Sequence, residues 1–161
     1  MHNETNFAKF RGMRESTYPI MTLFGRTLKF LNNEFEQRLQ KEQIPLTTVE
    51  FVLLYRLSVM HEDEITQKHF AQMERKHKSV ILRQIDGLEL KNLVVRHVDA
   101  SDRRKNNISL TEQGDDLLKR VLQVESKMMQ EMTEGISDEE LDILKKIALM
   151  IQKNALTISG K

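Results

Sequence analysis

The fold is decided by residues 90–114, which read LKNLVVRHVDASDRRKNNISLTEQG. Within this stretch the helical period gives way to alternation over Leu93–Val98 and again over Asn107–Leu110, which is the pattern of two paired strands. The residues between them, Asp99–Asn106, are polar and basic. The stretch therefore predicts a β-hairpin with a charged tip.

Two short helices are predicted directly before this hairpin. The first covers Ile65–Ala71 with Thr66 as its N-cap, and a basic turn, Met73–Lys76, leads into the second over His77–Leu90. The side chains expected to be buried on the second helix are Val80, Ile81, Ile85 and Leu88. Such a pair, with polar residues at the start of the second helix, is the helix-turn-helix pattern, although this turn lacks the glycine that many contain. With the hairpin behind it, the pattern predicts a winged helix-turn-helix.

Two further helices are predicted before this module. In the first, from Ile20 to Leu39, apolar residues recur every three or four positions, and Pro19 suits its first turn. Thr47 and Glu50 form a capping box for the second helix, over Thr48–Met60. The apolar residues expected to pack from the second helix are Phe51, Leu54, Tyr55 and Leu57.

Two more helices are predicted after the hairpin. The segment Leu117–Met132 carries a broad apolar stripe, and Gly135 ends the helix. Ser137 and Glu140 form a second capping box, which opens a last amphipathic helix over Leu141–Ile151. The predicted fold class is mainly α with a small β-hairpin wing (α+β), a winged helix-turn-helix flanked by dimerisation helices.

Charge is unevenly distributed along the chain, although the net charge is only +1. Residues 68–105 hold ten Lys and Arg against five Asp and Glu, so a basic middle lies between acidic flanks. This distribution is expected of a protein that presents one face to a polyanion, and it also arises by chance on solvated surfaces.

Composition excludes several classes of function. The chain has no cysteine, which rules out disulfides, thiol catalysis and cysteine-ligated zinc. No nucleophile elbow, P-loop, dinucleotide fingerprint or metalloprotease helix occurs, so we expect no enzyme, no catalytic residue, no metal and no cofactor. No apolar run approaches the length of a membrane helix, and we expect a cytoplasmic protein.

Three motifs around the hairpin carry a family resemblance. They are Leu88-Glu89 with Leu93-Val94-Val95-Arg96, then Asp102-Arg103-Arg104, then Ser109-Leu110-Thr111-Glu112-Gln113-Gly114. Together they resemble the MarR family of winged-helix transcription regulators, over about Thr17 to Ala155. Each motif alone is weak, and the D-x-R wing followed by the L-T-x-x-G turn is the specific combination. The resemblance implies a homodimer that binds an inverted-repeat operator in double-stranded DNA, usually as a repressor released by a small ligand.

The resemblance also implies roles for individual residues. Ser79 and Arg83 fall on positions that face DNA from the recognition helix. Arg104 matches a wing arginine that resembles a minor-groove reader, and Asp102 matches the carboxylate that holds it. The candidate DNA-binding residues are Thr66, Lys76, His77, Lys78, Ser79, Arg83, Asp102, Arg103, Arg104 and Lys105.

The chain departs from the family pattern at four positions. Asn92 stands where many members have glycine, but asparagine tolerates the left-handed conformation, so we expect the turn to be preserved. Leu82 stands where many members have Thr or Ser, which removes one possible hydroxyl contact with DNA. Glu74 and Lys76 replace residues that are apolar in many relatives, which leaves the packing of the helix-turn-helix corner open.

We expect residues 1–161 to form a single MarR-type domain with three parts. These are an N-terminal arm and dimerisation helix (1–44), the winged helix-turn-helix DNA-binding module (45–113) and C-terminal dimerisation helices (114–161). The outer helices would bury their apolar stripes across a two-fold axis, which matches a palindromic site. Two alternatives remain open: a helical interaction protein that uses the winged helix as a protein-docking surface, and a constitutive DNA binder without an effector.

Overall fold

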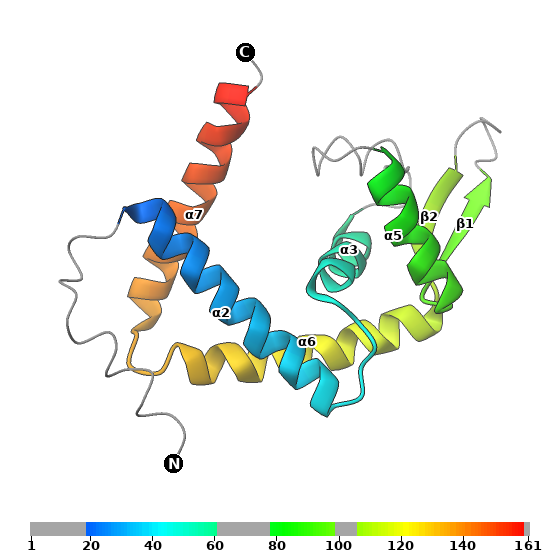
Figure 1. The fold of residues 1–161 in the computed structure, drawn as a ribbon, viewed down its shortest axis with the longest axis horizontal. Coiled ribbons are helices and arrows are strands. Elements are labelled where there is room, and N and C mark those ends of the chain that lie inside the picture. The colour runs from blue at the N-terminus through cyan, green and yellow to red at the C-terminus, as the bar shows by residue number, and fades with distance from the viewer. Residues whose placement is uncertain (1–18, 61–77, 99–105, 160–161) are drawn as a thin grey trace. The chain divides into compact units, whose positions relative to one another are not determined.

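The computed structural model describes residues 19–60, 78–98 and 106–159. Backbone contacts divide the chain into two compact units, residues 1–124 and 125–161. The elements within the described ranges are α2 (Ile20–Lys41), α3 (Thr48–Val59), α5 (Lys78–Leu90), β1 (Val94–Val98), β2 (Asn106–Leu110), α6 (Glu112–Met132) and α7 (Asp138–Ser159) (Figure 1). The prediction of a mainly helical chain with one β-hairpin is confirmed.

Helix α3 begins at the capping box that the sequence predicts. The Thr47 hydroxyl accepts from the backbone N–H of Glu50 (3.2 Å), and the Glu50 carboxylate accepts from the backbone N–H of Thr47 (2.9 Å). Two N–H groups at the helix start are thereby satisfied. Pro19 is the N-cap of α2, one position before the first turn that the sequence suggested.

The core of the first unit is formed where the helices meet the hairpin. α2 lies against α3, α3 lies against β2, and α5 lies against β1. The buried apolar side chains of this unit are Phe35, Leu39, Ile44, Leu46, Leu53, Leu54, Leu57, Ile81, Ile85, Leu88, Leu93, Val94, Ile108, Leu118 and Val121. The predicted module therefore shares its core with α2 and with the start of α6.

The buried faces of α5 and α3 differ from the prediction at one position each. Val80 is 44% exposed, because Ile81, Ile85 and Leu88 form the buried stripe of α5 and Val80 lies about 100° around the helix from Ile81. In α3 the buried side chains are Leu53, Leu54 and Leu57, whereas Tyr55 is exposed. Both segments are rich in apolar residues on more than one face, so periodicity alone did not select the buried one.

The hairpin is antiparallel, with Val94 opposite Leu110 and Val98 opposite Asn106. Because directly opposite residues share a face, Val94, Arg96, Ile108 and Leu110 lie on the same face of the hairpin. Val94 and Ile108 are buried there, so this face is the one that meets the core.

The turn between α5 and β1 confirms the expectation for Asn92, which has a left-handed φ of 56°. The N–H of Asn92 donates to the carbonyl of Glu89 (2.9 Å) and the N–H of Leu93 donates to the carbonyl of Leu88 (3.0 Å). This is the Schellman arrangement that ends many helices. Gln43 has the same conformation after α2, with a φ of 55°, and this second left-handed residue was not predicted.

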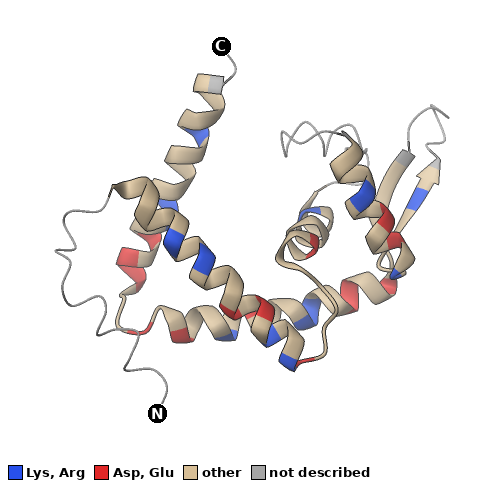
Figure 2. Cartoon of the chain, in the orientation of Figure 1, with Lys and Arg blue, Asp and Glu red and all other residues tan. Residues whose placement is uncertain are grey.

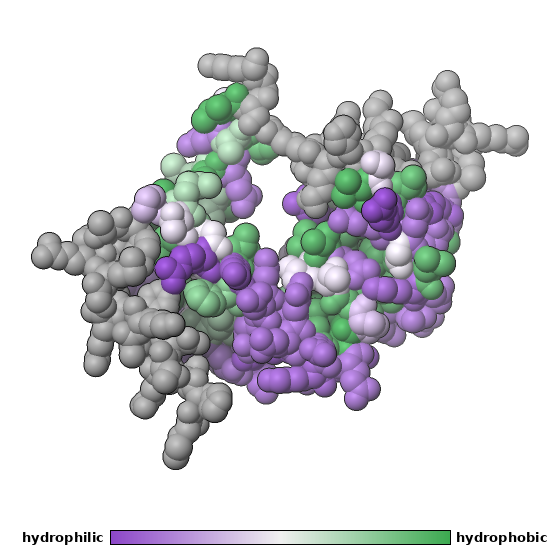
Figure 3. All heavy atoms as spheres, viewed as in Figure 1, coloured by the Kyte–Doolittle hydropathy of each residue, from purple (hydrophilic) through white to green (hydrophobic). Residues whose placement is uncertain are grey.

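The second unit holds the end of α6 and the whole of α7. Gly135 has a φ of 83° after α6, and the predicted capping box of Ser137 and Glu140 opens α7. α7 runs eight residues beyond the predicted end, to Ser159. Large apolar side chains on α7 are exposed within this unit (Figure 3): Ile143, Leu144, Ile147, Leu149, Met150, Ile151, Leu156 and Ile158.

Candidate nucleic-acid interface

Three of the ten predicted DNA-binding residues lie in described parts of the chain, and all three are on α5. Lys78 is the first residue of the helix, and the exposed residues Ser79 and Arg83 follow on it. Ser79 and Arg83 are four residues apart, so they lie on the same face of α5, one turn apart. The other predicted residues lie outside the described residues: Thr66, Lys76, His77, Asp102, Arg103, Arg104 and Lys105.

The exposed face of α5 is both polar and apolar. Leu82 and Val80 are 43% and 44% exposed and flank Ser79 and Arg83 on the two sides, each about 100° around the helix from Ile81. From the sequence, Leu82 was expected only to remove a hydroxyl contact, and Val80 was expected in the core. The helix therefore offers a guanidinium, a hydroxyl and two aliphatic side chains on one surface.

The C-terminal end of α5 is held by Lys91. Its ammonium donates to the Glu50 carboxylate (2.6 Å) and to the carbonyl of Pro45 (2.8 Å). Burial by itself raises the pKa of Glu50, but hydrogen bonds from Lys91 and from the Thr47 backbone outweigh it, so the pKa lies below its ordinary value. One carboxylate thus caps α3 and anchors the turn after α5.

A second set of ion pairs joins α5 to the hairpin. The guanidinium of Arg96, on β1, donates to the carboxylates of Asp86 and Glu89, both on α5. Figure 2 shows the basic position on β1 beside the acidic positions on α5. Local sequence patterns do not predict this contact, because the residues lie on two different elements and are seven and ten positions apart.

The start of α6 is fixed to the same turn. The Thr111 hydroxyl donates to the carbonyl of Asn92 (2.7 Å) and accepts from the N–H of Gly114 (2.9 Å). The side-chain amide of Asn92 donates to the Gln113 side chain (3.0 Å). The L-T-x-x-G motif is therefore the joint between the hairpin and α6.

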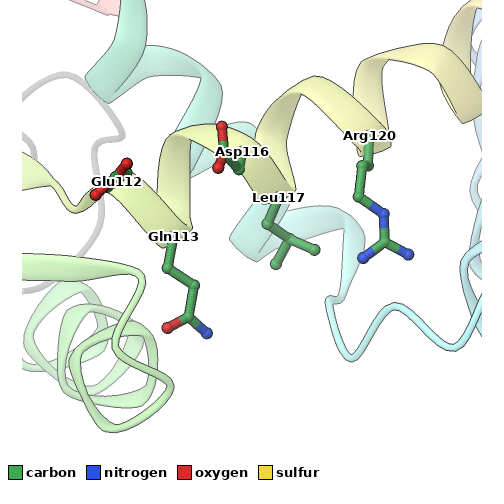
Figure 4. Close-up of a pocket in the computed structure, with 5 residues that line it drawn as sticks. All are labelled: Glu112, Gln113, Asp116, Leu117 and Arg120. Atoms are coloured by element: carbon green, nitrogen blue, oxygen red, sulfur yellow. The ribbon is translucent and has the colours of Figure 1, made fainter.

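A pocket of about 440 Å³ lies along the first turns of α6 (Figure 4). It is lined by Glu112, Gln113, Asp116, Leu117 and Arg120, and in Figure 4 the side chains of Gln113, Leu117 and Arg120 point to one side of the helix. Two acids and one base leave its lining net negative, which does not suit a polyanion. The DNA-facing candidates lie on α5 instead.

Residues 19–60, 78–98 and 106–159 contain no group of three or more His, Cys, Asp or Glu residues that is placed to hold a metal ion. Among the helices described there, none is both long and apolar enough to cross a bilayer.

Known structures share this architecture, although no family model matches the sequence. The DNA complex of MepR from S. aureus aligns with a TM-score of 0.73 and 26% identity, over 85% of this chain and 98% of that one. A crystal structure of MarR aligns with a TM-score of 0.74 and 19% identity, over 92% of this chain and 99% of that one. The chain has the winged-helix fold of the MarR-family regulators.

A MarR-family regulator from Rhodococcus sp. RHA1 aligns as well, with a TM-score of 0.71 and 23% identity, over 82% of this chain and 92% of that one. The match to nearly the full length of each neighbour means that the outer helices belong to the shared fold together with the winged helix. The MarR-family resemblance inferred from the hairpin motifs is therefore confirmed.

Proposed function

We propose that this protein is a sequence-specific, DNA-binding transcription regulator of the MarR family. The observation that carries the proposal is the surface of α5, a helix that packs against the hairpin and exposes Ser79 and Arg83 on one face. The same architecture is found in a MepR–DNA complex. An exposed helix with a basic residue, in such a fold, fits the major groove of B-DNA.

Each side chain on this face of α5 matches a chemical group of the DNA major groove. Arg83 matches guanine, whose O6 and N7 accept two hydrogen bonds from a guanidinium, and Ser79 suits a base edge or a phosphate. Leu82 suits the methyl group of thymine. From the sequence, we also propose that DNA is contacted by the basic residues between the two strands, Arg103, Arg104 and Lys105. Asp102 would orient Arg104 toward a narrow minor groove. Thr66, Lys76, His77 and Lys78 complete the proposed contacts.

We further propose a homodimer on an inverted-repeat operator. In the first unit, α2 exposes Ile20, Met21, Leu23, Phe24, Leu28 and Phe30, and in the second unit α7 exposes the apolar residues named above. Large exposed apolar side chains gathered on one helix are typical of an interface between protein chains. A two-fold dimer is the commonest assembly and would present two copies of α5 to two half-sites.

The proposed mode of action is repression relieved by a small ligand. This part of the proposal rests on the family resemblance. Val52, Tyr55 and Val59 are exposed on α3 and offer apolar and aromatic surface, the kind that lines most ligand pockets.

The test selects duplexes from a random library with the full chain and then measures binding by gel shift. We expect a palindromic consensus, and we expect Arg83→Ala to weaken binding to it. The matched control is Lys41→Ala, which also removes one exposed positive charge but lies at the end of α2. Recovery of unrelated duplexes, or equal binding by Arg83→Ala and wild type, would overturn the proposal and favour a protein-docking role for the winged helix.

A further inference from the structure

Arg96 occupies an unusual position in the hairpin. It shares the inward face with Val94 and Ile108, which are only 2% and 1% exposed. A charged side chain is seldom placed in a buried apolar row unless its charge is compensated. The Arg96 side chain is 22% exposed and contacts two carboxylates, so its positive charge is compensated at this site.

The two carboxylates come from the helix proposed to read DNA. Asp86 and Glu89 are three residues apart on α5, so one guanidinium reaches both of them. This contact joins α5 to β1 through two ion pairs in addition to apolar packing. Because the fork of a guanidinium is planar and rigid, it fixes direction as well as distance.

Asp86 also follows the DNA-facing candidates along α5. Ser79, Arg83 and Asp86 lie at positions i, i+4 and i+7, so they share one stripe of the helix. An uncompensated carboxylate at the end of that stripe would repel a phosphate backbone. Arg96 supplies the positive charge that compensates it, although the three charged groups together remain at −1.

We propose that Arg96 is a positioning residue for DNA recognition: it fixes the orientation of the hairpin relative to α5, so that both elements engage one duplex at the same time. The inference rests on the proposed function. When two binding elements are held at the correct separation, the second contact becomes intramolecular and adds affinity without a new site. Loss of the Arg96 contact therefore weakens the contribution of the hairpin more than that of α5.

The experiment compares two duplexes with wild type and Arg96→Met, a variant that keeps the length of the side chain and removes its charge. One duplex is the full selected sequence, and the other lacks the outer flanks that the hairpin is proposed to reach. For wild type, trimming should weaken binding about tenfold or more, which is the order expected when one of two linked contacts is lost. For Arg96→Met, affinity for the full duplex should fall, and trimming should then cost about threefold or less.

The matched control is Lys91→Met, because Lys91 also forms an ion pair at the end of α5, but its partner is Glu50 on α3 and not a residue of the hairpin. A variant that merely destabilises the fold lowers the active fraction equally on both duplexes. In Lys91→Met, the ratio of the affinities for the full and the trimmed duplex should therefore equal the wild-type ratio. If Arg96→Met keeps that ratio as well, Arg96 has no positioning role. If Arg96→Met does not fold, Asp86→Asn with Glu89→Gln and the charge-conserving Arg96→Lys take its place in the same comparison.

A readout without DNA separates this inference from the proposed function. The chain has no cysteine, so introduced cysteines at Leu82 on α5 and His97 on β1 can be spin-labelled specifically. The distance distribution between the labels, measured with labelled chain diluted into unlabelled chain, should broaden in Arg96→Met and stay narrow in Lys91→Met. An unchanged width in Arg96→Met would overturn the inference, whereas failure of wild type to select any duplex would overturn only the proposed function.

Discussion

A Cβ atom at position 114 would lie 2.0 Å from the carbonyl oxygen of Leu93. Only glycine allows this approach, which brings the first turn of α6 against the start of the hairpin. The N–H of Thr111 donates to the same carbonyl (3.1 Å), so this carbonyl is the point at which hairpin and α6 meet. The glycine of the L-T-x-x-G motif is thus required by backbone contact, not by backbone conformation.

Replacement of Gly114 by alanine should therefore be strongly destabilising. The obstructing atom belongs to the backbone, so the joint must open, and we expect a loss of about 3 kcal/mol or more in the free energy of unfolding. The control is Gly87→Ala on α5, whose Cβ would meet nothing nearer than 3.9 Å. That variant should gain about 0.5–1 kcal/mol from helix propensity. Urea denaturation of both variants measures the difference, and equal stabilities would contradict the account of the joint.

The left-handed residues give a second stability prediction. Gln43 holds a φ of 55° that costs a side chain about 1–2 kcal/mol, so Gln43→Gly should raise the free energy of unfolding by up to about 1 kcal/mol. Asn92→Ala should lower it by about 1 kcal/mol, because alanine keeps the strain and loses the hydrogen bond to Gln113. Thermal unfolding checks the opposite signs of the two changes. A stabilising Asn92→Ala would mean that this turn is not strained.

Glu50 should make stability depend on pH in the acid range. Its pKa is lowered in the folded state, so its contribution is fully present above the unfolded pKa near 4.5 and is lost as the pH falls through the folded value. The difference in unfolding free energy between wild type and Glu50→Gln should therefore be largest near neutral pH and should shrink on acidification. Denaturant titrations at a series of pH values between neutral and strongly acid conditions measure it. A difference that stays constant down to strongly acid pH would show that the Lys91 contact does not stabilise the charged form.

The exposed apolar residues of α7 give a prediction about assembly. A charge introduced at Ile147, which is 44% exposed within its own unit, should prevent association while leaving the helix intact. We expect Ile147→Glu to sediment as a monomer at micromolar concentration and to lose operator binding, and the wild type to sediment as a dimer. Lys153→Glu, an exposed change on the same helix, is the control and should leave the dimer intact. A monomeric wild type would rule out the proposed dimer.

Arg83 gives the sharpest prediction about sequence reading. Arg83→Ala should cost about 1–3 kcal/mol on the selected duplex and relax the preference at one base pair in each half-site. If about eight phosphates are neutralised per dimer, the slope of log affinity against log salt is about −7 for wild type, and it should change little in the variant. Titrations on duplexes with single base changes measure both quantities. A uniform loss on all sequences, with a shallower salt slope, would assign Arg83 to a phosphate.

Structural features that depend on residues close together in the chain could be predicted from the sequence. Each capping box joins residues three positions apart, so Thr47 with Glu50 and Ser137 with Glu140 were found without knowledge of the fold. The left-handed turn at Asn92 likewise follows from the few residues around it. Ser79 and Arg83 lie on one face of α5 for a similarly local reason, because four residues make about one helical turn.

Contacts between elements were decided only by the tertiary structure. Which face of α5 is buried depends on what packs against it, so Val80 was misassigned although the helix itself was predicted correctly. In the sequence, Arg96 is an ordinary strand residue. Only in the folded chain does β1 pack against α5, so that the Arg96 guanidinium contacts Asp86 and Glu89. The sequence determines local hydrogen bonds and periodicity because their partners are a few residues away. Packing selects among several apolar and charged faces of similar character, and it does so only when distant segments meet.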